Sequence, residues 1–183
     1  REAQKHGLFF GPETSTSSRC MIGGMVGNNS CGAHSILYGS TRDHVVSIKG
    51  FLSDGSEVEF SGLTAEEFLC KCQGDTLENK IYRQILDMLS DPANRERIRT
   101  EYPDPALNRR NTGYALDLLM DTQPFEPLIT NYGKPDDSHQ PAPFRSDPSS
   151  GIPRFNFCKL LAGSEGTLMF MTEITLNLVP LPP

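Results

Sequence analysis

The sequence CMIGGMVGNNSCGAH, residues 20–34, leads through Tyr38 and Gly39 into an apolar strand pattern. It holds four glycines among small polar residues. Glycine has no side chain to bury and loses more backbone entropy on folding than other residues, so this stretch contributes little to a core. Such a run is typical of places where the backbone closely approaches another segment or a bulky ligand. From these residues alone, backbone packing and a ligand site both stay open.

Local patterns predict the elements around this stretch. Apolar residues at its start predict a short helix, which Asn28 and Asn29 would end because asparagine tolerates the left-handed conformation. Residues 45–60 alternate in hydrophobicity on either side of SDGS and predict a β-hairpin. Residues 167–179 alternate along one face, interrupted by Thr172, and predict a strand or bent strand pair. The core face of the hairpin is expected to carry Val46, Ile48, Leu52, Val58 and Phe60, and the opposite face Val45 and Phe51. The apolar face of the later strand is expected to carry Leu168, Phe170, Ile174, Leu176 and Leu178.

Three helices are predicted within residues 62–120, which we interpret as a helical insertion. The first begins at a capping box of Thr64 and Glu67, the second is capped by Asp75, and the third starts at Asp91-Pro92. The second has an apolar stripe of Leu77, Ile81, Ile85, Met88 and Leu89; the third has charged residues expected on a solvated face, Arg95, Glu96, Arg97 and Arg99. Residues 121–153 hold seven prolines and are predicted to form a long loop.

Composition narrows the function classes. The 183 residues carry a net charge of −6 without a basic block, which argues against nucleic acid as a principal partner. No apolar run approaches the roughly 20 residues that span a bilayer. The five cysteines are an odd number and are expected to be reduced thiols. The lone C-x-C at Cys70 and Cys72 has no second pair or histidine cluster, so no metal site is expected here.

A second glycine-rich segment, AGSEGT at residues 162–167, precedes the last strand pattern. Two glycines around Ser-Glu predict a sharp turn whose N–H groups could converge on an acceptor, and a plain loop with a satisfied carboxylate is the alternative. Neither segment is a complete dinucleotide or Walker phosphate loop, because the G-x-G-x-x-G pattern and the lysine are missing.

Taken in order, these pieces resemble the flavin-binding oxidases and dehydrogenases related to vanillyl-alcohol oxidase, which share a PCMH-type FAD-binding domain. The resemblance is carried by the Ile22-Gly23-Gly24 triplet, Asn28, Gly32, His34, Tyr38-Gly39 and residues 163–167. More narrowly, the chain is similar to the branch that oxidises D-2-hydroxy acids: glycolate oxidase flavin subunits, D-lactate dehydrogenases and D-2-hydroxyglutarate dehydrogenases. Residues 81–82 and 111–116 resemble the large members, which carry an iron–sulfur domain after the flavoprotein part.

The resemblance implies an α+β fold, a mostly antiparallel sheet with flanking helices, that forms the second subdomain of the FAD-binding domain. Residues 1–183 would be one domain and a fragment of a larger FAD-binding domain. Its partners would be the first FAD subdomain and the substrate, or cap, domain of the parent chain. The implied cofactor is FAD, bound weakly or not at all by the fragment alone, and an iron–sulfur cluster would lie elsewhere in the parent. We expect a cytoplasmic protein whose membrane association is at most peripheral, at the inner membrane.

The resemblance also implies which residues contact the cofactor. They are Pro12, Ser18, Ile22, Gly23, Gly24, Asn28, Ser30, Cys31, Gly32, Gly163, Glu165, Gly166, Thr172 and Ile174. Residues 22–32 would line the flavin and its ribityl–phosphate arm, Pro12 and Ser18 the mouth of the pocket, and Thr172 and Ile174 the adenine or pyrophosphate side. The family often has Gly-Gly where this chain has Cys31-Gly32. His34 is the one titratable group of the stretch that could face the substrate and is the candidate catalytic residue, and the alternative is a position in the core or behind the residues that contact the substrate.

The expected function of the parent protein is oxidation of a D-2-hydroxy acid of the lactate, 2-hydroxyglutarate or glycolate class, with hydride transfer to FAD. The isolated fragment is expected to be inactive. Two alternatives stay open: another FAD-linked oxidase of the wider family, and a non-enzymatic module whose glycine-rich turns only pack together and whose partners bind through residues 121–153.

Overall fold

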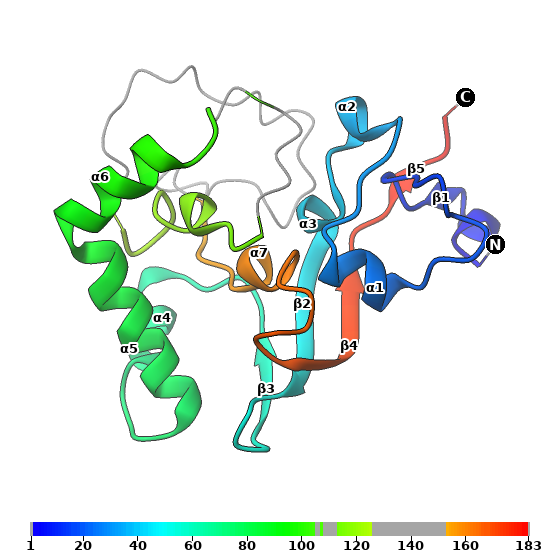
Figure 1. Cartoon of the computed structure of the whole chain (residues 1–183). Coiled ribbons are helices and arrows are strands. Elements are labelled where there is room, and N and C mark those ends of the chain that lie inside the picture. The colour runs from blue at the N-terminus through cyan, green and yellow to red at the C-terminus, as the bar shows by residue number, and fades with distance from the viewer. Residues whose placement is uncertain (1, 105–106, 108–112, 126–152, 183) are drawn as a thin grey trace.

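The computed structural model describes residues 2–104, 107, 113–125 and 153–182. In chain order its elements are η1 (Ala3–His6), β1 (Leu8–Phe9), α1 (Ile22–Gly27), α2 (Ser35–Tyr38), α3 (Thr41–His44), β2 (Val45–Phe51), β3 (Glu57–Phe60), α4 (Ala65–Lys71), α5 (Leu77–Ser90), α6 (Pro92–Glu101), η2 (Leu116–Leu118), α7 (Cys158–Leu161), β4 (Phe170–Leu176) and β5 (Val179–Pro180). Helices α4 to α6 lie on one side of the molecule and β1 and β5 on the opposite side, with the sheet and α7 between them (Figure 1).

Strands β3, β2 and β4 form a three-stranded antiparallel sheet, and β1 and β5 form a separate antiparallel pair. The predicted hairpin is present. The Leu52 amide donates to the Ser56 carbonyl at 3.0 Å, and Gly55 in the turn has a φ of +81°, which glycine adopts without a steric penalty. The predicted α+β fold, with a mostly antiparallel sheet and flanking helices, is confirmed.

The predicted alternation is wrong at the start of β2. Val45 is fully buried, whereas Val46 is only half-buried. The pairing of β2 with β4 shifts register between Val45 and Ser47, and such a bulge interrupts the two-residue alternation of a strand. The rest of the predicted core face is correct, because Ile48, Leu52, Val58 and Phe60 are all buried.

The core centres on an aromatic cluster where the helices meet the sheet. Phe68 of α4 packs edge-to-face on Phe155, with ring centroids 4.7 Å apart, and Tyr82 of α5 packs on Phe157 at 4.9 Å. Phe60 of β3 joins Phe157 at 5.2 Å. Edge-to-face pairs add about 0.5–1.5 kcal/mol each beyond burial, so these rings fix the helices against the sheet.

The first and third helices begin where the sequence predicts, and the second begins one residue later. Thr64 and Glu67 form the capping box of α4, and the Asp91 carboxylate accepts from the Ala93 amide at the start of α6. Helix α5 is capped by Thr76 with Asn79, so the prediction of Asp75 is wrong. Asn79 Nδ2 also donates to the Lys71 carbonyl at 2.8 Å, and this contact with the end of α4 favours the later start.

Two side-chain placements in these helices differ from the predictions. Met88 is 40% exposed, and Tyr82, at 1% exposure, is buried on α5 together with Ile85 and Leu89. Arg95 is buried at 8% exposure rather than solvated, and it donates to the carbonyls of Leu89 and Met120 at 3.2 and 2.9 Å. These hydrogen bonds, with the Asp121 carboxylate 3.6 Å away, explain why a charged residue is buried there.

The helices of the predicted insertion over residues 62–120 are α4, α5, α6 and η2. Most of the predicted loop over 121–153 lies outside the described residues. Its two described ends meet, because the Gln123 amide donates to the Pro153 carbonyl at 2.9 Å. The division of the chain into insertion and loop stays a prediction.

Candidate functional site

The two glycine-rich segments meet through backbone hydrogen bonds. Helix α1 ends at Gly27, Asn28 follows in helical conformation, and Asn29 turns into the left-handed region with a φ of +45°, as predicted for asparagine. The last carbonyls of a helix have no intrahelical partner. Here the Gly163 amide donates to the Val26 carbonyl and the Glu165 amide to the Gly27 carbonyl, both at 2.9 Å.

The turn over residues 162–167 needs its glycines. Gly163, Glu165 and Gly166 all have positive φ angles, of +96°, +52° and +77°. A Cβ on Gly163 would also lie 2.6 Å from a guanidinium nitrogen of Arg42. Residues with a side chain rarely adopt such φ angles, and a side chain at position 163 would also have no room, so this position of the turn requires glycine.

An open groove runs between α1, the turn and the start of β4, with a volume of about 490 Å³. Its lining residues are Gly23, Gly24, Gly27, Asn28, Glu165, Gly166, Met169, Phe170 and Met171. The structure therefore brings together five residues predicted to contact the cofactor, Gly23, Gly24, Asn28, Glu165 and Gly166.

The glycines divide between the two interpretations that the sequence left open. A Cβ on Gly32 would overlap the carbonyl oxygen of Glu13, so Gly32 serves close backbone packing. A Cβ on Gly23 or Gly24 would meet nothing within 4 Å, and neither residue has a positive φ. Glycine inside a helix costs about 0.8–1 kcal/mol relative to alanine, so packing within the described residues does not explain this pair.

The apolar wall of the groove differs from the prediction for β4. The apolar face predicted for residues 167–179 includes Phe170 and Leu168, but these two side chains are 71% and 40% exposed. Met169 is the buried neighbour, at 6%. Strand β4 is at the edge of the sheet, and its start lies along the groove, so no described element covers Phe170. Simple alternation could not reveal this, because it does not show which face another element covers.

The other predicted contact residues lie outside the groove lining. Pro12 is buried, Ser18 is exposed, and Ile22 begins α1 at 40% exposure. Ser30, Cys31 and Gly32 follow the helix, and Gly163 is the residue of the turn that contacts Arg42. Thr172 was expected to interrupt a core face, but it is exposed on β4 and donates to the Lys49 carbonyl at 3.3 Å. Ile174 of the same strand is half-buried.

His34, the candidate catalytic residue, lies outside the groove lining. Its Nδ1 atom is 3.0 Å from Glu13 Oε2, and its side chain is 54% exposed, so it does not occupy a core position. The buried histidine is His44, whose two ring nitrogens lie 2.7 and 3.2 Å from the carbonyl oxygens of Tyr38 and Asn177. This contact joins α3 to the segment after β4.

Two buried polar atoms on the segments that form the groove have no hydrogen-bond partner among the described residues. They are Nδ2 of Asn29 and Oγ of Ser164, in residues 1% and 2% exposed. Buried polar atoms nearly always have a partner, which can be protein, water or a ligand. Neither residue lines the groove, so these two atoms lie behind its walls.

All five cysteines are free thiols in the structure. Within the described ranges, no group of three or more His, Cys, Asp or Glu side chains could hold a metal ion. No helix in that part of the chain has both the length and the apolar character to cross a membrane.

Comparison with known proteins identifies the class of protein. Residues 1–61, which include α1 and the glycine-rich stretch, match the family model described as an FAD binding domain. The chain therefore carries part of an FAD binding domain, as the resemblance implied.

The relatives extend this match over nearly the whole chain. The chain is 32% identical over 177 residues, 97% of its length, to a D-2-hydroxyglutarate dehydrogenase of Pseudomonas putida, and 30% identical over 176 residues to one of Escherichia coli. A D-lactate dehydrogenase of Archaeoglobus fulgidus is 34% identical over 62 residues, 34% of the chain. The chain spans 14% of the length of each of these relatives. The chain is homologous to a segment of FAD-linked dehydrogenases.

Proposed function

We propose that the groove between α1 and the 162–167 turn binds part of FAD, in a protein that oxidises a D-2-hydroxy acid. The observation that carries this proposal is the pair Gly23 and Gly24, which line the groove and whose missing side chains leave open space. The family match of residues 1–61 and the names of the relatives support the cofactor and the substrate class.

The residues present fit a flavin nucleotide. A flat ring system needs a closely approaching backbone and an apolar wall, and the glycine backbone beside Met169 and Phe170 offers both. Gly23, Gly24, Asn28 and Gly166 would hold the cofactor, and Phe170 and Met171 would keep water from one side of it. FAD, when bound, supplies the acceptor for the hydride of the substrate.

The substrate-binding residues belong to the remaining length of the full protein in this proposal. The first FAD subdomain and a cap domain would complete the cofactor and substrate pockets, and an iron–sulfur cluster or a quinone would take up the electrons. The 183-residue chain alone is accordingly expected to bind FAD weakly, since it offers one open wall.

The absorbance spectrum of the full-length protein tests the cofactor. We expect a yellow protein with flavin bands that bleach when a D-2-hydroxy acid is added without oxygen. The substrate is identified by adding D-lactate, D-2-hydroxyglutarate or glycolate separately, with the L-enantiomers of the first two as controls. Bleaching by none of them, but by another alcohol or sugar, would favour a different FAD-linked oxidase. A colourless protein that takes up no added FAD would overturn the proposal and favour a module that only packs.

A further inference from the structure

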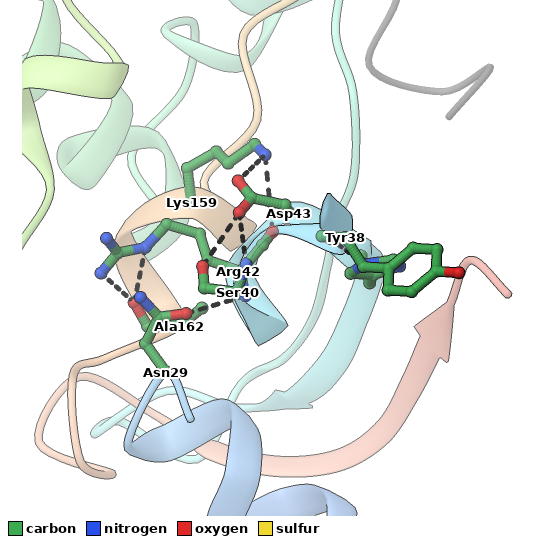
Figure 2. Close-up of polar contacts among 8 residues, drawn as sticks. Asn29, Tyr38, Ser40, Arg42, Asp43, Lys159 and Ala162 are labelled. Carbon is green, nitrogen blue, oxygen red and sulfur yellow. Dashed lines mark hydrogen bonds and ion pairs between the residues drawn. The ribbon is translucent and has the colours of Figure 1, made fainter. Parts of the chain in front are cut away.

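Arg42 of α3 is buried at 3% exposure and joins the two segments that form the groove (Figure 2). Its backbone amide donates to Asn29 Oδ1 at 2.8 Å, directly after α1. Its side chain reaches the turn, where Nε and Nη2 donate to the Ala162 carbonyl at 3.1 and 2.6 Å. Nη2 also donates to the Gly113 carbonyl at 2.9 Å.

The neighbouring residue reinforces the first of these contacts. Thr41 donates to the Ser30 carbonyl with both its amide, at 3.0 Å, and its hydroxyl, at 2.7 Å. The end of the glycine-rich stretch is therefore held by Thr41 and Arg42, and the start of the 162–167 turn by the Arg42 guanidinium. Gly163 permits this, because a Cβ there would collide with the guanidinium.

The backbone of Arg42 is itself fixed on two sides. Asp43 accepts from the Ser40 amide and hydroxyl at 2.8 and 3.0 Å, which forms the capping box of α3. Lys159 of α7 lies 3.8 Å from the Asp43 carboxylate and donates to the Arg42 carbonyl at 3.4 Å (Figure 2). The guanidinium therefore projects from an anchored turn of helix.

We propose that Arg42 is a positioning residue for the cofactor groove, because it sets the separation between α1 and the 162–167 turn without lining the groove. This inference rests on the proposed function. The planar guanidinium donates along fixed directions to two carbonyls at once, which a lysine ammonium cannot reproduce. A displacement of about 1 Å in a binding wall can lower binding or rate by orders of magnitude.

Arg95 provides a matched control. It is also a buried arginine that donates to two backbone carbonyls, those of Leu89 and Met120, but it lies on α6 and outside the groove lining. Each substitution removes the donors to two backbone carbonyls, and Arg95→Met also removes an ion pair with Asp121 at 3.6 Å, so both variants should lower the unfolding temperature. Only Arg42→Met should change the separation between α1 and the 162–167 turn, and with it the width of the groove.

The experiment measures two properties of the full-length protein with variants Arg42→Met, Arg42→Lys and Arg95→Met. The first is the Kd of FAD for the flavin-free protein, with the visible spectrum of the bound flavin. The second is hydrogen exchange of the Gly163 and Glu165 amides without flavin. We expect Arg42→Met to raise the Kd by about tenfold or more, Arg42→Lys to recover part of this, and Arg95→Met to stay within about twofold of wild type.

The outcomes separate the inference from the proposed function. Wild-type FAD affinity in Arg42→Met, or an equal loss in Arg95→Met, would overturn the positioning role and leave the proposed function standing. If the wild-type protein binds no FAD, the proposed function fails, and the hydrogen-exchange measurement then tests by itself whether Arg42 positions the turn. Faster exchange at both amides in Arg42→Met alone would then support Arg42 as the residue that positions the turn, and unchanged exchange would overturn it.

Discussion

The backbone amide of Glu165 donates a 2.9 Å hydrogen bond to the carbonyl of Gly27, across more than two thirds of the chain. This bond and its neighbour from Gly163 to Val26 turn two separate glycine-rich segments into the walls of one groove. Glu165 reaches it with a φ of +52°, an angle that few residues other than glycine adopt. The strained backbone therefore lies at the proposed cofactor site rather than in a remote loop.

Gly163→Ala should destabilise the protein. Alanine would have to adopt a φ of +96°, which is strained for a residue with a side chain. Its methyl group would also lie 2.6 Å from the Arg42 guanidinium and 2.9 Å from the Gly113 carbonyl. We expect a loss of about 1–3 kcal/mol in the free energy of unfolding, measured by urea denaturation. Gly27→Ala is the comparison, because its methyl would have only an ordinary contact, 3.7 Å from the Glu165 Cα. Equal stability of the two variants would contradict the turn geometry.

Gly24→Leu should separate cofactor binding from stability. A Cβ at position 24 meets nothing within 4 Å, and leucine is favoured in a helix over glycine by about 0.8 kcal/mol. The variant should fold at least as stably as wild type, but the side chain would occupy the groove. FAD affinity of the full-length protein should fall by about tenfold or more, as measured by titration of flavin fluorescence.

The control for this experiment is Gly62→Leu. A Cβ on Gly62 has only ordinary contacts, at 3.9 Å and beyond, with Arg154, and Gly62 does not line the groove. Its FAD affinity should match wild type. A Gly24→Leu protein that binds FAD normally would show that the cofactor lies elsewhere.

Asp43 should make stability depend on acidic pH. Burial by itself would raise the pKa of this carboxyl, but the Lys159 ammonium and the Ser40 hydrogen bonds outweigh it and hold the pKa below its ordinary value. A carboxyl whose pKa is lower in the folded state stabilises the fold at neutral pH, and this stabilisation is lost as pH falls below the ordinary value of about 3.9. Urea unfolding of wild type and Asp43→Asn at pH 7, 5, 4 and 3 should therefore give a difference that shrinks below about pH 4. A constant difference over this range would disprove the assignment.

The cysteines should differ sharply in reactivity. Cys70 is exposed, whereas Cys158 is buried against the Phe60 carbonyl, and burial raises the pKa of its thiol to about 12. At pH 8 only about one Cys158 thiol in ten thousand would be ionised, and the thiolate is the reactive form. Iodoacetamide should label Cys70 in the native protein and Cys158 only in urea, as read by mass spectrometry. Rapid native labelling of Cys158 would contradict its burial.

Short-range chemistry determined most elements of this protein. The capping box at Thr64 and Glu67, the Asp91-Pro92 helix start, the SDGS turn and the end of α1 at Asn29 each depend on contacts within a few residues. Such contacts join residues that are close in the chain and need no partner from a distant segment, so they could be predicted from the sequence. The order of the two glycine-rich segments was enough to indicate the flavin family, which the match of residues 1–61 supports.

Tertiary structure decided what these elements cover and contact. Asp75 and Thr76 are both suitable caps, and the contact from Asn79 to α4 favours the second. The sequence pattern predicts Arg95 as a surface residue, but its guanidinium is buried and donates to Met120, 25 residues away. Phe170 is predicted on the apolar face of its strand, but it lies exposed on the edge strand β4. Likewise, Gly32 and Gly24 are equivalent in sequence, yet one packs on Glu13 and the other opens into the groove. The physical reason is that burial and polar satisfaction depend on partners far away in the chain, which local periodicity does not contain.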